Sequence, residues 1–90
     1  DTLIYMIVRC KIVDNLNSLI VGNVIRQLRL SRGLSQDVLS GLAGIARSHL
    51  SMIETGTKMP NFETIWKLAG ALDMRPSELV GEIEKAYLMK

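Results

Sequence analysis

Residues 34–56 constrain the fold more than any other part of this sequence. The apolar residues of this segment recur at helical spacing and are interrupted once, where Gly44 is followed by Ile45. Glycine adopts the left-handed backbone of a tight turn without steric cost, and an apolar residue after it can fill the angle between two helices. We therefore predict two short helices joined by a tight turn, the first capped by Ser35 and the second covering about residues 47–55.

Three further helices are predicted outside this segment. One covers residues 19–32 and ends at Gly33, the next begins after Asn61, and the last begins at Pro76. Ninety residues leave room for one hydrophobic core, so we expect an all-α domain of five helices over residues 19–90. The residues expected to face its core are Val21, Val24, Ile25, Leu28, Val38, Leu39, Leu42, Ala43, Ala46, Leu50, Ile53, Phe62, Ile65, Trp66, Ala69, Leu72, Leu79, Val80, Ile83, Ala86 and Tyr87.

Residues 2–13 have a different pattern, because apolar residues occupy the even positions from 4 to 12 while both basic residues fall on odd positions. This alternation is typical of a short β-strand, and a short apolar helix is the competing interpretation. We treat residues 1–18 as an N-terminal extension, in which Met6 is a candidate translation start. Its apolar run is too short for a membrane span, and its basic residues follow that run, whereas in a signal peptide they precede it.

The net charge of +2 is unevenly distributed along the chain. Residues 19–58 carry five basic and two acidic side chains, whereas residues 59–90 carry four basic and five acidic ones. The positive excess therefore lies in the middle of the chain, where a polyanion would bind. The single cysteine, Cys10, cannot form a disulfide within the chain, and one histidine makes no metal-ligand set. We expect a cytoplasmic protein that uses neither a metal nor a cofactor.

The second helix of the central segment has an unusual outward side. On a helical wheel this side carries Ser48, Ser51, Met52 and Thr55, with Arg47 in the exposed first turn. An ordinary solvated helix face carries Glu and Lys, and this face carries neither. Small polar side chains headed by an arginine can approach base edges in the major groove of DNA without obstruction.

Short motifs stand in a consistent order along the middle of the chain. They are Ile25-Arg26-x-Leu28-Arg29, Arg32-Gly33-Leu34-Ser35-Gln36, Gly44-Ile45, Ile53-Glu54-x-Gly56, Pro60 and Ile65-x-x-Leu68-Ala69-x-Ala71-Leu72. Together they resemble the Cro/C1-type (Xre) helix-turn-helix family over about residues 22–80. The resemblance implies a compact, lambda-repressor-like bundle of five helices, and a transcriptional regulator, most simply a repressor. Such a protein binds double-stranded DNA specifically, with its third helix in the major groove of a pseudo-palindromic operator.

The resemblance also implies roles for individual side chains. The implied roles are base reading by Arg47, Ser48, Ser51 and Met52, contact with the DNA backbone by Gln36, Thr55, Thr57 and Lys58, and a largely buried ion pair between Arg29 and Glu54. His49 lies on the flank of the helix, where a surface histidine and a phosphate contact both remain open. The chain departs from the family at Ala46, where a Ser or Thr cap is usual, and at Ser40, which replaces a small apolar residue. Met52 cannot donate to a base edge and can only contact a thymine methyl.

Other classes of protein fit the sequence less well. Ser48 and His49 do not make a nucleophile and base, because neighbouring helical residues point about 100° apart, so we do not expect an enzyme. A protein-interaction helix would show large apolar anchors on its outward side. Among DNA-binding proteins, an antitoxin that binds a toxin protein and its own promoter, a restriction–modification controller and a phage-type repressor remain open.

A homodimer is the expected working unit, because one recognition helix reads only a few base pairs. The predicted dimer contact is the apolar side of the last helix, at Ile83, Ala86 and Tyr87. The rival contact is the N-terminal extension, since an exposed strand tends to pair with another chain.

Overall fold

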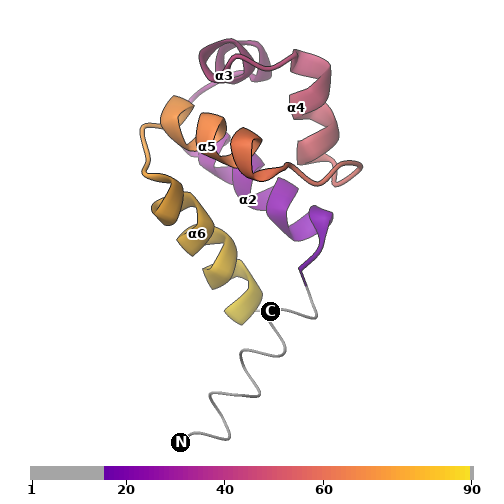
Figure 1. Ribbon diagram of the computed structural model, residues 1–90, viewed down its shortest axis with the longest axis vertical. Coiled ribbons are helices and arrows are strands. Elements are labelled where there is room, and N and C mark those ends of the chain that lie inside the picture. The colour runs from indigo at the N-terminus through magenta and orange to yellow at the C-terminus, as the bar shows by residue number, and fades with distance from the viewer. Residues whose placement is uncertain (1–15, 90) are drawn as a thin grey trace, which may run out of the picture.

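The computed structural model describes residues 16–89, which form five α-helices and no strand (Figure 1). The predicted all-α architecture is therefore confirmed, and α2 begins within two residues of its expected start. The strand predicted for residues 2–13 lies outside the described residues. None of the described helices combines the length and hydropathy needed to cross a membrane. The helices are α2 (Ser18–Ser31), α3 (Gln36–Ala43), α4 (Arg47–Glu54), α5 (Phe62–Ala71) and α6 (Pro76–Leu88).

Three helices begin at a polar side chain that caps their first turn. The Asn17, Ser35 and Asn61 side chains accept hydrogen bonds from the backbone N–H three residues later, at 3.0, 3.1 and 2.8 Å. These bonds satisfy donors that a helix leaves unpaired at its start. The caps predicted at Ser35 and Asn61 are confirmed. At Ala46, as expected, α4 has no side-chain cap.

All five helices contribute side chains to one hydrophobic core. The α2 helix packs against α4 and α6, and α3 packs against α4 and α5. In Figure 1, α3 and α4 form one end of the molecule and α6 reaches to the other. The largest fully buried side chains are Ile25, Leu39, Leu50, Ile53, Leu68, Leu72 and Leu79.

Several side chains that were predicted to face the core are exposed to solvent. Val38 and Leu42 are 48% and 62% exposed, and Phe62, Trp66 and Val80 are 72%, 58% and 52% exposed. The apolar side of α3 that meets α4 and α5 is a narrow stripe at Leu39, Ser40 and Ala43, so Val38 and Leu42 on its flanks face solvent. Ala46 is also exposed, because it precedes the first residue of α4. The sequence has more apolar residues than this core can enclose.

Candidate nucleic-acid interface

The turn between α3 and α4 has the geometry predicted for Gly44 and Ile45. Gly44 lies in the left-handed region, with φ 72° and ψ 32°. Its N–H and that of Ile45 donate to the Gly41 and Ser40 carbonyls, at 3.2 and 3.0 Å. The Ile45 side chain packs against the core. These contacts end α3 and fix the direction in which α4 begins.

Ser40 is buried although it replaces a small apolar residue. Its hydroxyl donates to the Asp37 carbonyl, one turn earlier in α3, at 3.2 Å. A buried hydroxyl without a partner would be costly, and this bond within the helix removes that cost. The departure at Ser40 is therefore accommodated without an unpaired buried hydroxyl.

Close backbone contact with α2 fixes the C-terminal half of α4. A Cβ atom at Gly22 would lie 2.0 Å from the Ile53 carbonyl oxygen, so only glycine allows this approach. Beyond the end of α4, the Ser18 hydroxyl donates to the Gly56 carbonyl at 2.6 Å. Neither contact could be predicted from the sequence, because a glycine inside a helix does not indicate which backbone lies against it.

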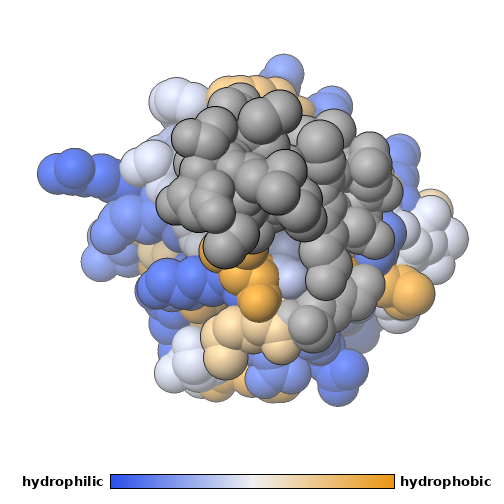
Figure 2. Space-filling model, turned by 90° about the horizontal axis from the view of Figure 1, so that it is seen from below, coloured by the Kyte–Doolittle hydropathy of each residue, from blue (hydrophilic) through white to orange (hydrophobic). Residues whose placement is uncertain are grey.

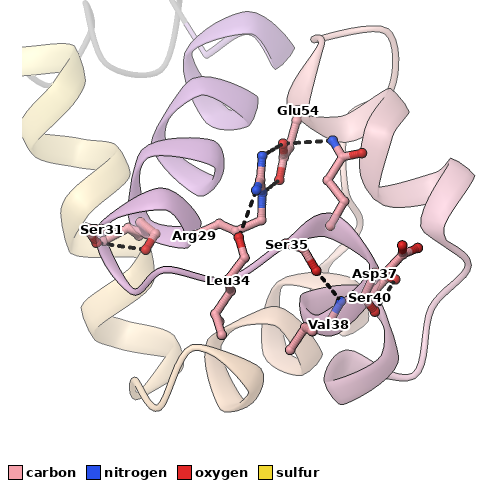
Figure 3. Close-up of polar contacts among 10 residues, drawn as sticks. Arg29, Ser31, Leu34, Ser35, Asp37, Val38, Ser40 and Glu54 are labelled. Carbon is pink, nitrogen blue, oxygen red and sulfur yellow. Dashed lines mark hydrogen bonds and ion pairs between the residues drawn. The ribbon is translucent and has the colours of Figure 1, made fainter.

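A buried ion pair joins the same two helices (Figure 3). The Arg29 Nε and Nη2 atoms donate to the two Glu54 carboxylate oxygens at 2.7 and 2.9 Å, and Arg29 Nη1 donates to the Leu34 carbonyl at 2.9 Å. The hydrogen bond with Glu54 raises the pKa of Arg29 against the opposing effect of burial. Gln36 Nε2 donates to Glu54 at 3.0 Å. These bonds connect α2, the start of α3 and the end of α4.

The outward side of α4 carries the residues implied to read bases. Arg47, Ser48 and Met52 are exposed, whereas Ser51 and His49 are half-buried. Arg47 Nε lies 3.2 Å from Asp37 Oδ1, and both side chains are well exposed. This ion pair was not predicted, because residues ten apart on two helices share no local pattern.

The loop after α4 is ordered by bonds to the last turn of the helix. The N–H groups of Thr57 and Lys58 both donate to the Met52 carbonyl, at 2.9 and 3.2 Å. The Thr55 hydroxyl donates to the same carbonyl at 3.2 Å and lies 3.0 Å from the Thr57 hydroxyl. Thr55, Thr57 and Lys58 are therefore held together, exposed, at the end of the outward side of α4.

Two of the three residues predicted to form the dimer contact are buried within one chain. Ile83 and Tyr87 are 8% and 5% exposed within one chain, and they belong to the core of the monomer. Ala86 is half-buried. This burial counts against the predicted contact, because α6 turns these residues inward onto α2 and α5. They offer little surface to a second copy.

Comparison with known proteins agrees with this geometry. A family model described as helix-turn-helix matches residues 25–79. The chain belongs to this family, of the Cro/C1 type, and it is a DNA-binding regulator of transcription.

Individual relatives match most of the chain. The restriction-modification controller protein C.AhdI of Aeromonas hydrophila, a solved structure, is 40% identical with a TM-score of 0.66, over 69% of this chain and 94% of that one. Control protein C.BamHI of Bacillus amyloliquefaciens is 35% identical over 69% of this chain and 78% of its own length. The immunity repressor of Bacillus phage phi105 is 39% identical over 69% of this chain, which spans only 43% of that repressor.

Proposed function

We propose that the protein is a repressor that binds a pseudo-palindromic operator as a homodimer, with α4 of each copy in the major groove. The observation that carries this proposal is the outward side of α4. It presents Arg47, Ser48 and Met52 on a helix whose other side is fixed by Leu50 and Ile53 in the core. A rigid helix with small outward side chains can enter a groove about 12 Å wide and reach base edges.

The proposed division of labour follows the position of each side chain. Arg47 can make a bidentate contact with guanine, Ser48 and Ser51 can donate to or accept from bases, and Met52 can contact a thymine methyl. The ordered loop after α4 would position the duplex through its phosphates. The proposed backbone contacts are His49, Thr55, Thr57, Lys58 and Gln36.

Gln36 supports both the protein fold and the proposed contact. Its side-chain amide already donates to Glu54, and it stands at the first position of α3. The free N–H groups at a helix start attract phosphate. Gln36 would therefore brace α4 while α3 meets the DNA backbone.

Selection of bound duplexes from a random library tests this function. It should return two related half-sites about one helical turn apart. On the selected site, Arg47→Ala should lower affinity by roughly 1–3 kcal/mol and relax the preference at one base pair. Lys58→Ala should weaken selected and random duplexes similarly and reduce the salt slope by about 0.9. If Arg47→Ala lowers affinity for selected and random duplexes equally, Arg47 does not read a base.

We also propose a different surface for the dimer. An apolar face is formed on α5 and α6, and in the loop before α5, by Phe62, Ile65, Trp66, Val80 and Met59. The Phe62 and Trp66 rings stack there with centroids 5.6 Å apart. The exposed rings make a ridge, and a groove beside them extends to the start of α6. Two copies related by a two-fold axis could insert each ridge into the partner's groove. Exposed apolar patches of this kind mark interaction sites.

The fluorescence of Trp66, the single tryptophan of the chain, reports on this surface. Dilution through the dissociation range should shift its emission to longer wavelength while sedimentation shows the mass falling to one chain. Val80→Glu should remain monomeric at concentrations where the parent is dimeric, with unchanged helix content. The control is Leu30→Glu, since Leu30 on α2 is similarly exposed at 49%.

An unchanged mass for Val80→Glu would place the interface elsewhere. The N-terminal extension is then the first alternative. Figure 2 shows hydrophobic patches among hydrophilic side chains on the face of the described chain seen from below Figure 1. Leu16, Leu88 and Met89 are exposed apolar residues in the described chain.

Among the regulatory classes, we favour a restriction–modification controller over a phage-type repressor or an antitoxin. This preference rests on the 40% identity with C.AhdI, of which the chain covers 94%. Genes for an endonuclease and a methyltransferase beside this gene would support it. A small toxin that co-purifies with the protein would favour an antitoxin instead.

A further inference from the structure

We infer that Ser18 is a positioning residue for residues 55–58, the loop proposed to contact the DNA backbone. This inference rests on the proposed phosphate contacts of that loop. Ser18 is the first residue of α2, and its hydroxyl donates to the carbonyl of Gly56, 38 residues away in the sequence, at 2.6 Å. The start of α2 does not need this hydroxyl, because the Asn17 side chain caps the helix.

The peptide group between Gly56 and Thr57 is held at both of its polar ends. The Gly56 carbonyl accepts from Ser18, and the Thr57 N–H donates to the Met52 carbonyl at 2.9 Å. The C=O and N–H of a trans peptide point in opposite directions, so a rotation of this group would break both bonds. Gly56 has a φ of 81°, and glycine populates negative φ about as readily. The bond from Ser18 therefore selects the orientation that directs Thr57 and Lys58.

The start of α2 is fixed firmly enough to support the loop. The Asn17 N–H donates to the hydroxyl of Tyr87, a buried residue of α6. A Cβ atom at Gly56 would lie 2.5 Å from Leu19 Cδ2 and 3.0 Å from Leu19 Cα, so the loop is in close contact with the first turn of α2. Ser18 thus joins the loop to α2 and α6, which lie outside the proposed reading helix.

The bond with Gly56 influences DNA binding through the free protein. The same bond is kept in the complex, so its own strength cancels from the affinity. It raises affinity only by keeping the free loop out of conformations that bind phosphate less well. The observed affinity falls in proportion to the fraction of free chains that hold the binding conformation. A single hydrogen bond changes such an equilibrium about two- to tenfold, which sets the upper limit of the effect.

The first test is Ser18→Ala, which removes the hydroxyl. Affinity should fall about two- to fivefold for the selected operator and for a random duplex alike, since both offer phosphates to the loop. The ratio of the two affinities and the log–log salt slope should not change, because the same complex forms once the loop is ordered. Ser18→Thr keeps a hydroxyl and should restore the affinity. An unchanged affinity for Ser18→Ala, or a loss confined to the operator, would overturn the inference.

The matched control is Ser31→Ala. Ser31 is the last residue of α2, and its hydroxyl also donates to a backbone carbonyl, that of Leu28 at 2.8 Å. It is exposed and lies at the other end of the helix from Ser18. This variant loses a bond of the same kind and should leave both affinities unchanged. Thermal unfolding is measured alongside, because a purely structural role of Ser18 would lower the unfolding midpoint and leave the affinity of the folded chain unchanged.

A double-mutant cycle with Lys58→Ala tests whether Ser18 acts through the loop. If it does, Ser18→Ala should have less than about a twofold effect once the Lys58 side chain is gone. If the effect persists in full, Ser18 acts by another route and the inference is wrong. Lys58→Ala alone separates the two proposals. No loss on either duplex would reject the proposed phosphate contact of the loop, whereas a normal Lys58 effect with no Ser18 effect rejects only the present inference.

Discussion

The two ends of α4 each carry an ion pair between an arginine and a carboxylate, and the two pairs differ in nearly every physical respect. At the C-terminal end, Arg29 and Glu54 have side chains that are 10% and 2% exposed. At the N-terminal end, the Arg47 and Asp37 side chains are 66% and 78% exposed. The buried pair has two parallel hydrogen bonds and further partners at both residues. The exposed pair has a single contact.

This difference shows how one short helix can be both anchored and adaptable. Breaking a buried pair leaves a charge without water or partner, so it is strongly destabilising. An exposed pair is screened by solvent and exchanges partners at little cost. The fold therefore fixes α4 at its buried end, and the proposed DNA contact depends on the end where partners can change.

Removal of the buried carboxylate should have the largest effect on stability. Glu54→Ala leaves the Arg29 guanidinium buried without its counter-charge, and the expected loss of unfolding free energy is about 3–5 kcal/mol. Urea denaturation measures this loss, and a cycle with Arg29→Ala isolates the coupling between the two residues. A loss below about 1 kcal/mol would mean that the buried pair contributes no more than an exposed pair. The ion pairs at the two ends of α4 would then not differ in their effect on stability.

Gly22→Ala tests the backbone contact at the same anchored end. The new methyl group would meet the Ile53 carbonyl, which belongs to α4 and cannot move independently. We expect a loss of about 1–3 kcal/mol in unfolding free energy, as for an overpacked core. The control is Gly70→Ala on α5, where a Cβ would meet nothing within 4 Å. That variant should gain roughly 0.5–1 kcal/mol from helix propensity, and equal effects at the two sites would contradict the contact.

Ala46→Ser should strengthen the exposed end of α4 by a smaller amount. Ala46 has the extended backbone of an N-cap residue, with φ −67° and ψ 144°, and no side-chain bond to the first turn. A serine there can accept a hydrogen bond from that turn, so we expect a gain of about 0.5–1 kcal/mol. Chemical denaturation measures it. An unchanged midpoint would show that the start of α4 is already satisfied by other means.

Local features of this fold could be predicted from the sequence. The turn at Gly44 and the caps at Ser35 and Asn61 depend on the backbone preferences of single residues and their nearest neighbours. The association of Arg29 with Glu54 was implied only by the family resemblance. Periodicity alone placed the two residues on different helices and gave no reason to pair them.

Tertiary features could not be predicted in the same way. An apolar stripe can be read from spacing, but the width that neighbouring helices cover depends on how they cross. This is why Val38, Phe62 and Trp66 were wrongly expected in the core, and why Ile83 and Tyr87 were assigned to a dimer contact although one chain alone buries them. The approach of Gly22 to α4 and the contact of Asp37 with Arg47 likewise depend on the crossing geometry.

The smallest stability effect is expected where the proposed functional effect is largest. Arg47→Ala removes an exposed side chain whose one ion-pair partner, Asp37, remains fully hydrated, so the unfolding free energy should change by no more than about 0.5 kcal/mol. Truncation also removes a positive charge from the positive end of α4, which offsets part of the lost pair. Parallel denaturation curves and operator-binding titrations on one preparation measure both effects. A loss above about 1.5 kcal/mol in stability would show that the exposed end of α4 also anchors the fold. The two ends of the helix would then differ in degree and not in kind.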